Sequence, residues 1–69
     1  MTLGEKVRTL RTERGWSQKE LARRAQVRPA LVSELEANLK TDSTGSVLRR
    51  LAATLGVTVD YLAGVYDAR

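Results

Sequence analysis

Apolar residues recur every three or four positions along most of this chain, as they do on one face of an α-helix. The first such stripe is Leu3, Val7 and Leu10. Thr2 and Glu5 have the spacing of a capping box, in which each side chain accepts a hydrogen bond from the other residue's backbone amide. β-Branched residues never alternate over a useful length, so no strand is expected. The pattern predicts an all-α protein.

A second helix is expected after Gly15, a residue suited to the left-handed end of the first. Ser17 and Glu20 repeat the capping-box spacing, and Trp16 and Leu21 are placed for a hydrophobic staple around that cap. A stacking role on unpaired bases is the alternative for Trp16. The stretch from 21 to 25 presents leucine and two alanines inward, which lets a neighbouring helix approach closely.

A third helix is expected to begin near Pro29, because proline suits the first helical position. Val32 and Leu35 share one face with Leu31 at its edge, and Asn38 is a suitable left-handed end. The opposite face is small and weakly polar, unlike a solvated face crowded with Lys and Glu. Its residues are Ala30, Ser33, Glu34 and Ala37.

Two further helices complete the prediction. One begins around Ser43 or Thr44 and ends at Gly56, and the last is capped by Thr58 and closed by Gly64. A chain of 69 residues is too short for two cores, so residues 1–69 are expected to form a single domain, a compact bundle of five short helices. The second and third helices are joined by a very short turn. This turn is either an ordinary corner of the helical core or an arrangement that holds the third helix outward, toward a binding partner.

Charge and missing residue types narrow the function. Twelve Lys and Arg against eight Asp and Glu give a net charge of +4, which suits a polyanionic partner or serves solubility alone. The chain has no cysteine and no histidine, and no phosphate-cradling Gly-rich loop or close carboxylate pair is apparent. We therefore expect no enzyme activity, no metal and no cofactor. Without a long apolar run or a signal-peptide pattern, the chain is expected to be cytoplasmic and without membrane contact.

Three segments together resemble a known family. "SQKELARRAQV", "LVSELEAN" and "LRRLAATLGVTVDYL" are similar, in this order and spacing, to lambda-repressor and Cro-type (XRE-like) helix-turn-helix domains. The resemblance runs from about Leu3 to Leu62 and implies a bacterial or phage origin. It implies that the second and third helices form the DNA-binding unit, with the third helix in the major groove and the second across the backbone.

The resemblance also implies which residues meet double-stranded DNA. The base-reading positions are Arg28, Pro29, Ala30, Ser33 and Glu34. Arg28 either donates two hydrogen bonds to guanine, pairs with Glu34 or binds a phosphate. Gln18 would touch the backbone and brace the third helix. The further positions expected to contact the DNA backbone are Ser17, Lys19, Arg11, Arg23, Leu31, Asn38, Lys40, Thr41 and Ser43.

This chain departs from the family pattern in its turns. Gln26 stands where the family usually has glycine between the second and third helices. That turn then requires a non-glycine residue at positive φ, at roughly 1 kcal/mol. Gly45 also occupies an early position of the fourth helix that is often apolar in the family.

The expected function is sequence-specific transcriptional regulation, most simply repression, by a homodimer on a palindromic operator. Tyr61, Val65 and Tyr66 form an apolar cluster suited to the dimer contact. No small-molecule ligand is expected. The alternatives are an antitoxin or other protein-interaction module on the same scaffold, or a controller-type activator or repressor of a restriction–modification system.

Overall fold

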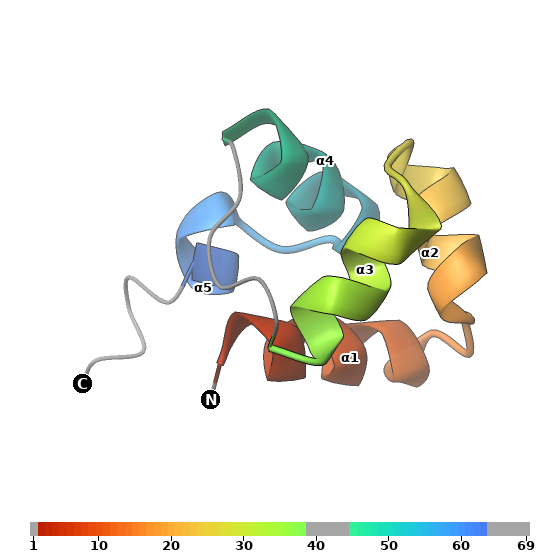
Figure 1. Cartoon of the computed structure of the whole chain (residues 1–69). Coiled ribbons are helices and arrows are strands. Elements are labelled where there is room, and N and C mark those ends of the chain that lie inside the picture. The colour runs from red at the N-terminus through yellow and green to blue at the C-terminus, as the bar shows by residue number, and fades with distance from the viewer. Residues whose placement is uncertain (1, 39–44, 64–69) are drawn as a thin grey trace.

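The computed structural model describes residues 2–38 and 45–63, which contain five helices and no strand. The helices are α1 (Leu3–Glu13), α2 (Gln18–Ala25), α3 (Pro29–Glu36), α4 (Gly45–Leu55) and α5 (Val59–Ala63). Figure 1 shows α3 at the front of the bundle, between α1 at the bottom and α2 at the right of the view. In the same view α4 lies at the top and α5 at the left. The predicted all-α bundle of five short helices is confirmed.

The core is built from apolar residues that recur at helical spacing on the five helices. Its fully buried larger members are Val7, Leu21, Val32, Leu35, Leu51, Leu55 and Leu62. Ala22 and Ala25 of α2 are buried with them, so α2 can lie close to its neighbours. Burial of each Leu or Val stabilises the fold by roughly 1.5–3 kcal/mol, which makes these stripes the main source of stability.

Side-chain caps fix where the first helices begin. At α1, Thr2 N donates to Glu5 Oε1 (2.9 Å) and Glu5 N donates to Thr2 Oγ1 (3.1 Å), so the predicted capping box is confirmed. At α2, Ser17 Oγ accepts from Glu20 N (3.0 Å). The predicted return hydrogen bond, from Ser17 N to the Glu20 side chain, is wrong. The Glu20 carboxylate accepts from Arg23 and Arg24 instead.

The corner between α2 and α3 is made by a left-handed residue. Gln26 has φ 60° and ψ 45°, as expected from its replacement of the family's glycine. Val27 N donates to Ala22 O (3.0 Å) and Gln26 N to Arg23 O (3.3 Å), the two bonds of a Schellman motif. Arg50 of α4 also donates to Gln26 O (3.3 Å). The corner is therefore closed by backbone and side-chain hydrogen bonds.

The later turns also follow their sequence signals. Asn38 (φ 61°) and Gly56 (φ 75°) adopt the left-handed conformation expected of them. Thr58 Oγ1 accepts from Tyr61 N (3.0 Å) at the start of α5, as a cap should. The predicted α4 start at 43 or 44 and the closing Gly64 lie outside the described residues. Within the described part of the chain, no helix is both long and apolar enough to cross a membrane.

Two residues of α1 make contacts that the apolar pattern did not indicate. Gly4 is buried against α3, where an added Cβ would lie only 2.0 Å from Leu35 O. Lys6 is not part of the apolar stripe of Leu3, Val7 and Leu10, yet it is only 2% exposed, and its Nζ donates to Tyr61 O (2.9 Å) on α5. α1 therefore joins α3 through a close backbone approach and α5 through a buried cation.

Candidate nucleic-acid interface

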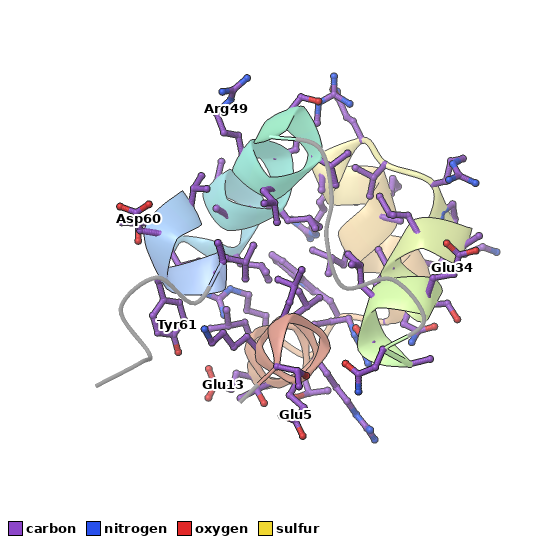
Figure 2. All side chains as sticks on the ribbon, turned by 60° about the vertical axis from the view of Figure 1, so that its left-hand side comes forward. Glu5, Glu13, Glu34, Arg49, Asp60 and Tyr61 are labelled. Atoms are coloured by element: carbon purple, nitrogen blue, oxygen red, sulfur yellow. The ribbon has the colours of Figure 1, made fainter. Side chains whose placement is uncertain are left out.

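The outer face of α3 is open to solvent. Arg28, Pro29, Ala30 and Ser33 are exposed, and Glu34 is half-buried. Figure 2 shows Glu34 on the side of α3 that faces away from the core. The structure thus places four of the five predicted base-reading residues on α3 and the fifth, Arg28, directly before it. We call this surface, Arg28, Pro29, Ala30, Ser33, Glu34 and Ala37, the outer face of α3.

The side chain of Arg28 is exposed at the start of α3. It precedes α3 and its side chain makes no capping hydrogen bond. Among the described residues, no hydrogen bond or ion pair joins Arg28 to Glu34. The pairing of these two side chains, considered from the sequence, is therefore not found.

The inner face of α3 belongs to the core. Val32 and Leu35 are fully buried, and Leu31 is 7% exposed. Leu31 packs among apolar neighbours of the core, and the contact with the DNA backbone expected of it stays a prediction. Its burial follows from helix geometry, because Leu31 lies one turn before Leu35 on the inward side.

A buried carboxylate fixes the end of α3. Glu36 Oε2 accepts from Arg11 Nε (2.7 Å), and Glu36 Oε1 accepts from Arg11 Nη2 (2.9 Å) and from Gln18 Nε2 (3.0 Å). The side chains of Arg11 and Glu36 are only 12% and 6% exposed. Their hydrogen bond raises the pKa of Arg11, against the lowering effect of burial. Three helices meet at this one acid.

This network changes the roles expected of Arg11 and Gln18. Arg11 Nη1 also donates to Trp16 O (2.8 Å), so each nitrogen of the guanidinium has a partner inside the protein. Arg11 therefore holds the helices together, and the phosphate contact expected of it is not favoured. The predicted bracing of α3 by Gln18 is confirmed by its bond to Glu36.

Glu36 was not among the site residues predicted from the sequence. The available signal was its position four residues after Val32, which places a carboxylate beside the buried face of α3. An acid at such a position requires a partner. Arg11 supplies it from 25 residues away, so helical periodicity alone did not identify the pair.

The outer face of α2 carries a second, exposed set of charges. The Glu20 carboxylate accepts from Arg23 Nη2 (2.5 Å) and Arg24 Nε (2.6 Å). These hydrogen bonds lower the pKa of Glu20, and the bond from Arg23 has the larger effect. Arg24 also lies 4.5 Å from the centre of the Trp16 ring. Trp16 is half-buried against the core, which favours the packing role over base stacking.

A hollow of 340 Å³ opens where α1, α2 and α3 meet. Its lining is mostly polar and comprises Arg8, Arg11, Gln18, Ser33, Glu36 and Ala37. Ser33 and Ala37 are also members of the outer face of α3. The hollow is thus continuous with the surface that was predicted to read bases.

The remaining predicted site residues are dispersed. Ser17, Lys19, Arg23 and Asn38 are exposed around α2 and the end of α3. Tyr61, expected at a dimer contact, is 39% exposed and projects from α5, as Figure 2 shows. The other expected backbone and dimer contacts lie outside the described residues. They are Lys40, Thr41, Ser43, Val65 and Tyr66.

A bundle of five helices with an exposed third helix, held by a closed corner, is the architecture of a helix-turn-helix protein. A model of the helix-turn-helix family matches residues 7–62, and this chain belongs to that family. The resemblance inferred from the sequence is confirmed at this level.

Two proteins similar to this chain are HTH-type transcriptional regulators. The HTH-type transcriptional regulator SinR of Bacillus licheniformis is 34% identical over 65 residues, which are 94% of this chain and 59% of SinR. The HTH-type transcriptional regulator DdrOP3 of Deinococcus deserti is 42% identical over 66 residues, or 94% of this chain and 50% of DdrOP3. This chain spans somewhat more than half the length of SinR. These relatives are regulators, which agrees with the expectation that the chain is not an enzyme.

Solved structures share the fold closely. A crystal structure of SinR, the master regulator for biofilm formation, in complex with DNA has a TM-score of 0.84 and 34% identity. The matched region covers 88% of this chain and 97% of the SinR chain in that structure. The N-terminal DNA-binding domain of SinR from Bacillus subtilis has a TM-score of 0.84 and 35% identity, with 87% of each chain covered.

Proposed function

We propose that this protein is a transcriptional regulator that binds specific double-stranded DNA, with the outer face of α3 in the major groove. One observation carries the proposal. The outer face of α3 is exposed, while its inner face is buried and its last residue is held by Arg11 and Gln18. A helix that is fixed on one side and open on the other is suited to enter a groove. The complex of SinR with DNA supports the same use of this fold.

The residues of the outer face suit different base edges. Arg28 can donate two parallel hydrogen bonds to guanine O6 and N7. Pro29 and Ala30 offer apolar contact to thymine methyl groups. Ser33 can donate or accept, and Glu34 can accept from cytosine N4. In this assignment, Arg28 contributes the largest share of base discrimination.

Residues around α2 and at the end of α3 would contact the DNA backbone. Gln18 lies in the first turn of α2, where backbone amides and the helix dipole favour a phosphate. Ser17, Lys19, Arg23 and Asn38 are exposed and complete the proposed backbone contacts in the described part of the chain. Lys40, Thr41 and Ser43 are proposed on their sequence positions alone.

We further propose that a homodimer binds a palindromic operator, with half-sites roughly 34 Å apart, and represses transcription by blocking polymerase. The exposed Tyr61 on α5 supports a contact there between two copies, together with Val65 and Tyr66. A role in protein interaction, as in an antitoxin, is the second candidate. It is favoured by a solved complex of SinR with the SinI protein, which matches this chain with 30% identity and a TM-score of 0.85.

Random-site selection tests the reading role directly. The unaltered protein should recover a palindrome. Arg28→Ala should lose the preference at one base pair in each half-site, by about 1–3 kcal/mol. Gln18→Ala should weaken binding to all sequences similarly.

Arg49→Ala is the matched control, because Arg49 is exposed on α4 and points away from α3 in Figure 2. It should leave the selected sequence unchanged. If Arg28→Ala selects the same sequence as the unaltered protein, the assignment of Arg28 to base reading is wrong.

A further inference from the structure

The hollow between α1, α2 and α3 lies where a bound duplex would have to pass. Gln18 on its α2 side is a proposed backbone contact, and Ser33 on its α3 side is a proposed base contact. A duplex that meets both residues covers the mouth of the hollow. A phosphate of that backbone would then face the third wall, which is α1.

The charges around the hollow single out one residue. Arg11 and Glu36 are joined in a bidentate pair, so together they add no net charge to the wall. Arg8, the other α1 residue in the lining, is exposed and forms no hydrogen bond or ion pair with any described residue. The net positive charge of the lining therefore resides on Arg8, supported by the nearby N-terminus of α2.

The shape of the hollow also suits an anion. The 340 Å³ space stays open partly because its α3 wall ends in Ala37, whose side chain is small and exposed. Glu36 also lines the hollow, but its carboxylate oxygens accept from Arg11 and Gln18 and its side chain is only 6% exposed, so its charge is offset by Arg11. An arginine beside such a space can donate two hydrogen bonds to phosphate oxygens.

We propose that this hollow seats a phosphate of the DNA backbone and that Arg8 is the cation that binds it. The inference rests on the proposed DNA-binding function and adds α1 to the interface. It also replaces Arg11, the arginine expected from the sequence, by its neighbour one turn earlier on the same helix.

The test compares two variants with the same change of charge. Arg8→Gln and Arg49→Gln each remove one exposed cation, but only Arg8 lines the hollow. Affinity is measured between 50 and 200 mM salt for two duplexes. One is the duplex selected by the unaltered protein, and the other is a scrambled duplex of equal length and composition.

Arg8→Gln should reduce the slope of log K against log salt by about 0.9, the value for one phosphate contact. At about 0.1 M salt this corresponds to a roughly eightfold loss of affinity, on both duplexes alike. Arg8→Lys should restore the slope, because the charge is retained. Arg49→Gln should leave the slope unchanged, and all variants should unfold at the temperature of the unaltered protein.

An unchanged slope in Arg8→Gln would overturn the inference while leaving the proposed function intact. An equal reduction in Arg49→Gln would also overturn it, because the effect would then belong to the net charge of the protein. If the unaltered protein binds neither duplex, the proposed function fails and this inference fails with it.

Discussion

Glu36 and Glu20 each accept hydrogen bonds from two other side chains, but they join very different parts of the molecule. Glu36 takes its donors from α1 and α2 while it lies at the end of α3. Glu20 takes both donors, Arg23 and Arg24, from its own helix. The side chain of Glu36 is 6% exposed and that of Glu20 is 30% exposed.

This difference decides which pair shapes the protein. A charge that is left unpaired in a buried place is strongly unfavourable, whereas an exposed pair gains little over its interaction with water. The region joining α1 to α3, with Glu36 and Gly4, therefore sets the position of α3. The charged residues on the outer face of α2 pair only within α2, so they do not fix its position relative to the other helices.

Removal of Glu36 should have the largest effect. Glu36→Ala leaves the Arg11 guanidinium buried without its acid, and we expect the free energy of unfolding to fall by about 3 kcal/mol. Denaturant unfolding measures this. The double variant Arg11→Met with Glu36→Leu should recover most of the loss, because no buried charge remains. A loss from Glu36→Ala as small as that from Glu20→Gln would remove the distinction between the two regions.

Gly4→Ala should have the next largest effect. Alanine favours helices over glycine by about 1 kcal/mol, yet here its Cβ would meet the Leu35 carbonyl. We expect a net loss of about 2 kcal/mol in the free energy of unfolding, since backbone of α3 must move. Gly45→Ala is the control, because a Cβ at Gly45 meets nothing within 4 Å. Equal stability of the two variants would show that α1 does not constrain α3 at this point.

Glu20→Gln should have the smallest effect, and it should depend on pH. Hydrogen bonds from Arg23 and Arg24 lower the pKa of Glu20, so any stabilisation is present above the ordinary carboxyl pKa of about 4.3 and is lost as pH falls below it. Thermal unfolding at neutral pH should barely separate the variant from the unaltered protein. Their difference should vanish in acid. A difference that grows in acid would contradict the ion pair.

Local physics explains why much of the fold was predictable. Capping by Thr2, the turn at Gln26 and the stripe through Leu35 each depend on residues within one or two helical turns. The exposed outer face of α3 followed from the same periodicity. Such features are encoded in neighbouring residues, so the sequence alone sufficed for them.

The parts that escaped prediction depend on long-range contacts. Lys6 reads as a solvated cation until the Tyr61 carbonyl, 55 residues later, comes within 2.9 Å of it. Gly4 reads as an ordinary glycine until Leu35 lies against it. Arg11 reads as a free surface charge until Glu36 pairs with it. In each case, the meaning of the residue is set by a partner on another helix.

The most direct test of DNA contact at α3 is a titration of isotope-labelled protein with the selected duplex, followed through backbone amide chemical shifts. We predict the largest changes at Arg28, Ala30 and Ser33, with a second group at Gln18 and small changes at Arg49. If the largest changes surround Arg49 on α4 while those three amides stay unperturbed, α3 is not the helix that meets DNA.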